Sequence, residues 1–348
     1  MKKTPYLLLF VLWVLALNAN ATVHRVNNNV GASAAFSNFN TAVASPSVLN
    51  GDTLYLEPST TAYTPVQLNK RLVVIGAGYF LDPANTSFPG NTGLQANTNS
   101  ARFASALAFD TLATGSRFLG VEISTLWLDP RADNITFERC YIVSDITWNT
   151  NATAGQQAVG IRFNKCFISG GFSYSTFTFV DLEITNCIYN TSFNTSSATV
   201  LSALIRNNLF TNSVTIQNAY FANNIVTNVG VGSFSAINCV VRNNISQFPN
   251  VFPAGNGNQS APGSDVTRII LNTGTADGRF RLSPTSIAIG AGETVGGVTP
   301  DVGPFGTADP YRLSGIPPIP TIYSLTVPAT VPAAATTMNI TLSTRSNN

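Results

Sequence analysis

The residues that could carry acid–base or metal chemistry are few in this chain. Asp and Glu together number 16 among 348 residues, and His24 is the single histidine. The best local candidate pair of carboxylates is in Asp129-Pro-Arg-Ala-Asp133, in which Arg131 lies between the two. Two carboxyl groups about 6.5–9.5 Å apart suit hydrolysis of a glycosidic bond with inversion. Asp129, Arg131 and Asp133 are therefore the candidate catalytic residues, although the same pattern is typical of an ordinary turn.

A second group could bind a ligand without reacting with it. Asp145 and Trp148 follow shortly after, in a stretch expected to be a loop. A tryptophan ring can stack on a sugar ring, so this pair could line a sugar-binding groove, with local packing of Trp148 as the alternative. No His or carboxylate recurs near the four cysteines, so the sequence predicts no metal site and implies no cofactor.

The elements that must position these residues are expected to be strands. Charged residues make up 10% of the chain, against about 25% in ordinary globular domains. The hydrophobic content of 44% argues against a disordered chain, and no basic stripe exists that could neutralise nucleic-acid phosphates. Abundant Asn, Ser and Thr supply the polar surface instead. This composition favours an all-β fold.

The first 21 residues are expected to be a signal peptide. Lys2 and Lys3 precede an apolar run over residues 7–17, and Ala19-Asn20-Ala21 is typical of a cleavage site. The signal peptide would direct export of the chain, and its cleavage near Ala21 would leave a mature chain with no net charge. No second apolar run approaches the length of a membrane span, so none is predicted.

The middle of the chain repeats. Each repeat begins with a short stretch in which apolar and polar residues alternate. A Cys or Asn comes next, and two further residues follow it, the first of them apolar. Aligned on that residue, the repeats are spaced by 26, 21, 21, 16 and 20 positions. The aligned residues are Cys140, Cys166, Cys187, Asn208, Asn224 and Asn244.

A period near 20 with strand-like alternation predicts a parallel β-solenoid, in which each coil buries its apolar side chains against its neighbours. The six aligned residues would then form a buried structural ladder, because amides about 4.8 Å apart can hydrogen-bond along the stack. Asn also tolerates the left-handed backbone that corners require. For the cysteines, disulfides between neighbouring coils remain the alternative, and Cys239 lies five positions before its aligned residue.

Motifs near both ends resemble a known family. The entry strand 22–26 precedes a helical pattern with Ser33 as its expected N-cap, and then come the stretches 50–58 (NGDTLYLEP) and 70–78 (KRLVVIGAG). Residues 277–292 resemble a last coil, with Gly290 where an Asp is usual, and residues 301–320 resemble a closing segment. Together these motifs resemble secreted right-handed parallel β-helix proteins of the pectin-lyase-like superfamily from Gram-negative bacteria.

The resemblance implies a single-stranded right-handed parallel β-helix over residues 22–316, with a short N-terminal capping helix. Residues 317–348 would form a strand-like cap or tail, because an uncovered last coil invites edge-to-edge pairing. The location would be the periplasm, the cell surface or the outside of a Gram-negative bacterium, and the chain would be a monomer.

Two hypotheses for the function follow. The superfamily that the chain resembles includes lyases that bind Ca²⁺ through clustered carboxylates. It also includes hydrolases that use an Asp-Asp pair and a His. This sequence lacks the Asp-Asp pair, and its carboxylates are thinly spread. The preferred interpretation is an exported, non-catalytic protein that binds a polysaccharide or a cell-surface glycan along a sheet face. The alternative is a divergent polysaccharide lyase or glycoside hydrolase acting on uronic-acid polymers, for which Ca²⁺ could be required.

Overall fold

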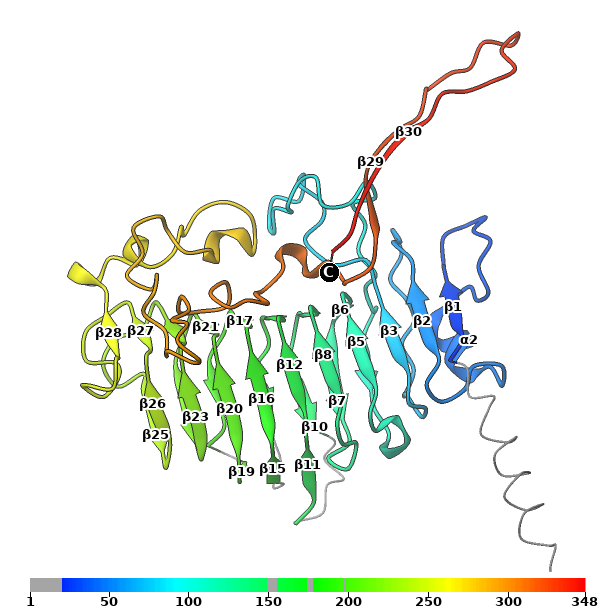
Figure 1. Ribbon diagram of the computed structural model, residues 1–348. Coiled ribbons are helices and arrows are strands. Elements are labelled where there is room, and N and C mark those ends of the chain that lie inside the picture. The colour runs from blue at the N-terminus through cyan, green and yellow to red at the C-terminus, as the bar shows by residue number, and fades with distance from the viewer. Residues whose placement is uncertain (1–20, 149–154, 174–177, 197, 348) are drawn as a thin grey trace, which may run out of the picture.

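The chain folds as a parallel β-solenoid of about nine turns, which confirms the predicted fold class. We analysed a computed structural model that describes residues 21–148, 155–173, 178–196 and 198–347 (Figure 1). The expected signal peptide, apart from Ala21, lies outside these residues. Within the described residues, no helix has the length and apolar character needed to cross a membrane.

The largest side of the solenoid is a ten-stranded parallel sheet, called here the long sheet. Each coil contributes one strand, and the strands lie side by side in Figure 1 in the order in which the sheet pairs them. In that order they are β1 (Val23–Val26), β2 (Thr53–Leu56), β3 (Val73–Ile75), β5 (Arg117–Leu119), β8 (Thr136–Glu138), β12 (Arg162–Asn164), β16 (Leu182–Thr185), β20 (Ala203–Arg206), β23 (Ala219–Ala222) and β26 (Val240–Arg242).

The second side is an eight-stranded sheet, called here the second sheet. All but the last of its two-residue strands follow a strand of the long sheet after one corner. They are β6 (Glu122–Ile123), β9 (Tyr141–Ile142), β13 (Phe167–Ile168), β17 (Ile188–Tyr189), β21 (Leu209–Phe210), β24 (Ile225–Val226), β27 (Ile245–Ser246) and β28 (Gln259–Ser260).

Shorter sheets complete the circuit of the coil. One contains β4 (Ala106–Ala108), β7 (Thr125–Leu128), β10 (Ile146–Trp148) and β14 (Phe172–Ser173). The others are β11 (Gln157–Val159) with β15 (Thr178–Val180) and β19 (Thr199–Val200), and β18 (Phe193–Asn194) with β22 (Val214–Gln217) and β25 (Phe234–Ile237).

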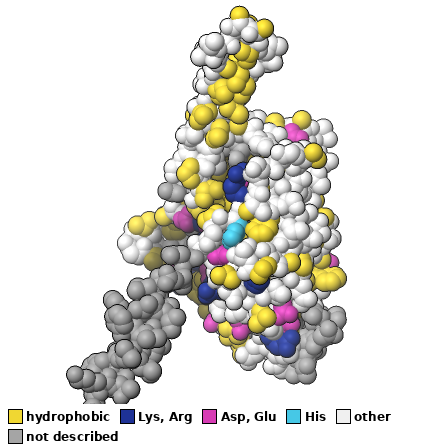
Figure 2. All heavy atoms as spheres, turned by 90° about the vertical axis from the view of Figure 1, so that its right-hand side faces the viewer, with side chains coloured by type: hydrophobic (Ala, Val, Ile, Leu, Met, Phe, Trp, Pro, Cys, Tyr) yellow, Lys and Arg dark blue, Asp and Glu magenta, His cyan; other side chains and the backbone are white. Residues whose placement is uncertain are grey.

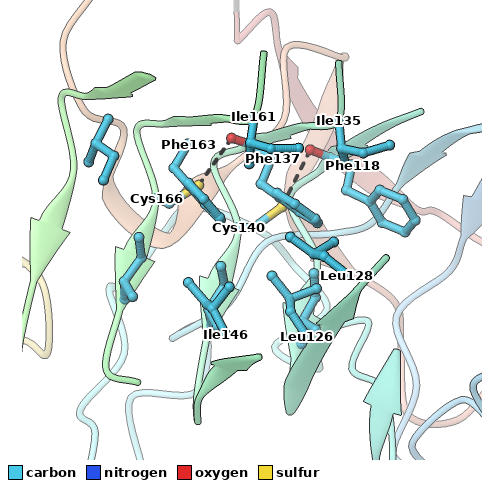
Figure 3. Close-up of a cluster of buried hydrophobic side chains, with 14 of the residues drawn as sticks. Phe118, Leu126, Leu128, Ile135, Phe137, Cys140, Ile146, Ile161, Phe163 and Cys166 are labelled. Carbon is cyan, nitrogen blue, oxygen red and sulfur yellow. Dashed lines mark hydrogen bonds between the residues drawn. The ribbon is translucent and has the colours of Figure 1, made fainter. Parts of the chain in front are cut away.

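The interior is filled by like residues stacked from coil to coil (Figure 3). Phe118, Phe137 and Phe163 occupy one register position on successive strands of the long sheet, and all three are fully buried. The last two rings stack with centroids 5.2 Å apart. Strict alternation along each strand produces this arrangement, because every second side chain must point inward.

The six aligned Cys and Asn residues lie in one buried column directly after the corner between the long sheet and the second sheet. The Asn208 backbone N–H donates to Asn224 Oδ1 at 2.9 Å, and the Asn224 N–H donates to Asn244 Oδ1 at the same distance. Asn258 extends the column by one member, since its Oδ1 accepts from the Asn244 N–H at 3.0 Å. All four cysteines are free thiols in this structure.

The left-handed residue of each corner is the one before the ladder residue. Arg139, Lys165, Asn186, Asn207, Asn223 and Asn243 all have φ between 52° and 57°. The ladder side chain therefore hydrogen-bonds along the stack while its predecessor turns the chain. This refines the expectation that the ladder residues themselves would adopt the left-handed backbone.

The N-terminal helix is shorter than the sequence pattern predicted. Helix α2 spans Phe39–Ala44, and its N-cap is Asn38 rather than Ser33. The expected earlier start is wrong because Phe36 pairs with Val26 in a parallel bridge, which requires extended backbone at that point. Phe39 and Val43 pack under the first coil, as a capping helix should.

A C-terminal layer covers the outward face of the second sheet. Phe167, Ile188 and Leu209 on that face are buried against residues of the segment 261–316, among them Phe280 and Val302. This segment contains the single-turn 3₁₀ helices η3 (Pro262–Ser264), η4 (Val266–Arg268), η5 (Gly278–Phe280) and η6 (Leu313–Gly315). Its last part, residues 291–316, is called here the strap and runs back along the corner next to the long sheet (Figure 1).

The C-terminal segment, predicted to be a strand-like cap or tail, forms an antiparallel hairpin of β29 (Thr321–Thr326) and β30 (Thr341–Arg345). Its base is joined to the body by a hydrogen bond from the Ala96 N–H to the Ile322 carbonyl at 2.8 Å. Figures 1 and 2 show the rest of the hairpin projecting from the solenoid with hydrophobic side chains along it.

Candidate functional site

The candidate catalytic residues lie in a turn after β7, on the opposite side of the coil from the strap. Arg131 binds Asp129 through two nitrogens, Nε to Oδ1 at 2.9 Å and Nη2 to Oδ2 at 2.8 Å. This guanidinium holds the pKa of the Asp129 carboxyl below its ordinary value. Asp133 accepts instead from the Val159 N–H of the next coil at 2.9 Å. Both carboxylates are thus engaged in local structure.

Of the two candidate ligand-binding residues, Trp148 is buried and Asp145 is on the surface. The Trp148 side chain is 1% exposed and packs against Phe172 and Phe179 in the core, so its ring offers no face to a ligand. The Asp145 carboxylate is on the surface, where Oδ1 accepts from the Gly171 N–H at 3.1 Å. The structure therefore does not bring these two side chains together in a groove.

An exposed tryptophan, Trp127, lies on β7, the strand that pairs with β10. Its side chain is 53% exposed on β7, between the fully buried Leu126 and Leu128. Strand alternation was the available signal, because two inward leucines require the residue between them to point outward. Small or short residues, Ala108 and Thr147, occupy the paired positions on the neighbouring strands.

The most regular charged feature lies on the outward face of the long sheet. Every second strand from β5 to β26 carries one outward arginine, a set called here the arginine row. Arg117 and Arg162 share one register position, and Arg206 and Arg242 share another that lies two residues further along the strands. The two strands of each pair are two strand spacings, about 9.5 Å, apart. The side chains are 49%, 41%, 26% and 45% exposed in chain order. The four residues are Arg117, Arg162, Arg206 and Arg242.

Carboxylates lie between the arginines. Glu138 pairs with Arg117 from the intervening strand β8, and Glu183 pairs with Arg162 at 3.3 Å from β16. Each arginine thus has a partner, which fixes its position on the face. Because a guanidinium has five N–H donors, donors remain for an external anion.

At the C-terminal end of the row, the carboxylate comes from the strap. Glu293 lies 3.4 Å from Arg206 and 3.2 Å from Arg242, and it accepts from the Tyr220 hydroxyl at 2.6 and 2.7 Å. Burial and this carboxylate raise the pKa of the Tyr220 phenol. One carboxylate therefore sits in a cradle of two guanidiniums and a phenol. The geometry of this part of the face accommodates a carboxylate.

The strap is fastened to the left-handed corner residues. Asn223 Oδ1 accepts from the Glu293 N–H at 2.8 Å, and Asn243 Nδ2 donates to the Ala291 carbonyl at 3.2 Å. Asn186 Nδ2 donates to Thr307 Oγ1 at 2.7 Å. The corner column thus both turns each coil and holds the strap beside the arginine row.

Two of these corner residues carry charge. Arg139 donates to the Ile316 carbonyl at 2.8 Å, and Lys165 forms an ion pair with Asp309. Both side chains are almost completely buried, and burial lowers the pKa of Arg139. A bulky residue at positive φ costs about 1–2 kcal/mol, so these contacts with the strap offset local strain.

The described residues contain no group of three or more His, Cys, Asp or Glu side chains that could hold a metal ion. The long sheet instead offers one guanidinium on every second strand, with Glu138 and Glu183 from the intervening strands and Glu293 from the strap beside them. Such an arrangement suits binding of repeated anionic groups. Sequence reasoning missed it because the arginines are 45, 44 and 36 positions apart, a spacing that has meaning only once the register is known.

Comparison with known proteins gives no match: no family model, no curated protein and no solved structure is similar to this chain.

Proposed function

We propose that this protein binds an extended acidic polysaccharide along the outward face of the long sheet. The observation that carries the proposal is the arginine row, one guanidinium on every second strand over seven consecutive strands. A linear polymer with carboxylates at intervals can place one anionic group beside each arginine. The proposal needs no cofactor.

The Glu293 cradle supports a carboxylate as the recognised group. In it, the chain's own carboxylate receives donors from Arg206, Tyr220 and Arg242. Guanidinium–carboxylate contacts are directional and stronger than neutral hydrogen bonds. A uronic-acid polymer offers the same carboxylate, with ring hydroxyls that could reach the amide and hydroxyl side chains of the face, such as Asn164 and Thr185.

Export by a signal peptide, a bacterial cell-surface or periplasmic location and membership of the pectin-lyase-like superfamily belong to the same proposal. They rest on the sequence motifs described above and agree with the solenoid fold. A monomer suffices, because a single chain carries the whole row.

Binding would be measured with immobilised polygalacturonate and alginate, and with neutral dextran for comparison, over a range of salt concentrations. We expect binding to the acidic polymers that weakens as salt rises, because exposed charges are screened. An exposed ion pair is worth about 0.2–1 kcal/mol, so each arginine-to-alanine change should weaken binding up to roughly fivefold. The double variant Arg162→Ala/Arg242→Ala should weaken binding by the product of the two fold-changes measured for the single variants.

The matched control is Arg268→Ala. Arg268 is exposed on η4, in the layer over the second sheet and away from the arginine row. The proposal is wrong if dextran binds as tightly as the acidic polymers, or if Arg268→Ala lowers affinity as much as Arg162→Ala does.

The alternative function, cleavage of uronic-acid polymers by a divergent lyase or hydrolase, is tested with the same substrates. Release of unsaturated or reducing ends would be followed with and without Ca²⁺. Turnover that disappears in Asp129→Ala or Asp133→Ala would replace the binding proposal with catalysis at that turn.

A further inference from the structure

The outward face of the second sheet changes character at its N-terminal end. One register column runs through Tyr141, Phe167 and Ile188. Phe167 and Ile188 are buried under the C-terminal layer, whereas Tyr141 packs against Phe80 of the loop that follows β3. At its N-terminal end, Glu122 on β6 and then Arg102 continue the column. The apolar column therefore becomes charged where the covering layer ends.

A pocket of about 200 Å³ opens at this point. Its wall is the loop 79–100, which enters between β3 and β4. This volume is below the roughly 300–1,000 Å³ of pockets that take drug-sized ligands, so it suits a single ring. The lining includes Phe80, Asp82, Phe88, Arg102, Glu122 and Tyr141.

Two charged residues of the pocket lining, Arg102 and Glu122, are not paired with each other. Arg102 Nη2 donates to the Thr60 carbonyl at 3.1 Å, whereas Glu122 Oε2 accepts from the Ser100 hydroxyl at 3.1 Å. Burial raises the pKa of the Glu122 carboxyl. A ligand with adjacent hydroxyl groups could accept from the guanidinium and donate to the carboxyl at the same time.

The aromatic wall of the pocket is held in a strained conformation. Phe80 has φ of 48°, a value that is rare for a bulky residue. Its carbonyl is fixed by the Asn91 N–H at 2.9 Å and the Ser314 hydroxyl at 2.8 Å. The ring stacks on Phe88 with centroids 5.7 Å apart and an interplanar angle of 12°. Strain maintained by several contacts is characteristic of functional sites.

The loop closes at Gly90 through backbone contacts that leave no room for a side chain. The Gly90 N–H donates to the Asp82 carbonyl at 3.0 Å, and a Cβ on Gly90 would lie 2.7 Å from backbone atoms of Asp82 and Phe80. Asn91 then anchors the loop by donating to the buried Asp277 at 2.7 Å. The pocket wall is therefore preorganised.

We propose that this pocket binds a single neutral sugar ring, independently of the arginine row. The C–H face of the sugar would lie against Phe88, which is 40% exposed, and its hydroxyls would reach Arg102 and Glu122. Asp82 and Glu122 together outweigh Arg102 in charge, so the pocket disfavours an anionic ligand.

The test is saturation-transfer NMR and calorimetry on the full chain with neutral hexoses and pentoses, with galacturonate and with Ca²⁺. We expect at least one neutral sugar to bind with a Kd on the order of 1 mM. Phe88→Ala should weaken it roughly two- to tenfold, by loss of the aromatic contact. Glu122→Gln should weaken it as well, and Leu112→Ala, an exposed apolar site on η2 (Thr111–Ala113), should not.

Phe88 is partly exposed on a loop, so its removal should leave the fold intact, which circular dichroism would verify. The inference is overturned if no neutral sugar binds at 50-fold this concentration, about 50 mM. It is also overturned if both pocket variants bind like the native chain, or if Ca²⁺ or galacturonate is the better ligand. Arg162→Ala should leave sugar binding unchanged, which separates this site from the proposed polysaccharide face.

Discussion

The buried asparagine ladder offers a stability test whose outcome can be worked out atom by atom. Asn224 lies in the middle of the column with no exposed surface. Its Oδ1 accepts from the Asn208 backbone N–H at 2.9 Å and from Asn208 Nδ2 at 3.0 Å. Its Nδ2 donates to the Ile205 carbonyl at 2.9 Å and to Asn244 Oδ1 at 3.2 Å. The change Asn224→Ala removes all four hydrogen bonds.

The cost follows from the groups left behind. The Asn208 backbone N–H and side-chain amide both lose an acceptor in the interior, and a buried polar group without its partner costs about 1–3 kcal/mol. Two such groups predict a loss of roughly 2–6 kcal/mol in the free energy of unfolding. Native domains are stable by only about 5–15 kcal/mol, so the effect should be large.

The chain supplies its own matched control, because cysteine occupies the same column in earlier coils. Cys187 Sγ accepts from the Cys166 N–H at 3.3 Å and donates to the Phe163 carbonyl at 3.4 Å. Asn224→Cys should therefore retain weaker versions of the contacts along the stack. We expect it to cost at least about 1 kcal/mol less than Asn224→Ala.

Hydrogen exchange of the Asn208 amide is the sharpest assay, since long repeat arrays can unfold in parts and depart from two-state behaviour. Urea unfolding followed by far-UV circular dichroism gives the global value. The ladder reasoning is refuted if Asn224→Ala lies within about 0.5 kcal/mol of the native chain, the range of ordinary surface substitutions. It is also refuted if Asn224→Cys is as damaging as Asn224→Ala.

Three further predictions concern charge and thiols. Glu293→Gln should raise affinity for acidic polysaccharide several-fold in the immobilised-polymer assay, because Arg206 and Arg242 lose their internal carboxylate; unchanged affinity would show that the cradle does not compete with a ligand. The pKa of the Glu122 carboxyl is raised in the fold, so the native state holds the Glu122 proton more tightly than the unfolded chain does. The contribution of Glu122 to stability therefore falls as pH rises from the ordinary pKa of a glutamate through the raised one. Glu122→Gln removes that loss, so its melting temperature relative to the native chain should increase between pH 4 and pH 7, and a constant difference would contradict the assignment. Burial raises the pKa of Cys140 and Cys166 well above the ordinary value, so a thiol reagent should leave both residues unmodified in the native chain. After urea is added, the reagent should titrate four thiols per chain without reductant. Fewer than four thiols would indicate disulfides between coils.

The repeat and its buried column could be predicted from the sequence because both depend on inward residues. An inward position is constrained by the coils above and below it, so Cys or Asn recurs there and marks the register. The pairing of Phe137 with Phe163 and of Phe163 with Ile184 follows from that alignment. The corner geometry was partly predictable, because Asn is common at positive φ, but Arg139 and Lys165 at equivalent corners gave no such signal.

The candidate site could not be predicted in the same way. The inference about Trp148 rested on residue type, whereas its position at the inward end of β10 depends on how the preceding loop sets the register. The partners of Lys165 and Tyr220 are 144 and 73 positions away in the strap, and nothing local indicates them. Charged contacts between distant segments are set by tertiary packing.

The low charge content and the arginine row have one physical cause. Outward side chains at the same register position on neighbouring strands are about 4.8 Å apart, where two like charges repel by about 0.9 kcal/mol even in water. At two strand spacings the repulsion halves, and a carboxylate on the strand between turns it into attraction. A solenoid therefore carries arginines on one face at lower cost when they are spaced by at least two strands and interleaved with acidic or neutral residues. Arg117, Thr136 and Arg162 obey this rule on consecutive strands. The spacing that stability requires is the same spacing that would present a regular series of donors to an anionic polymer.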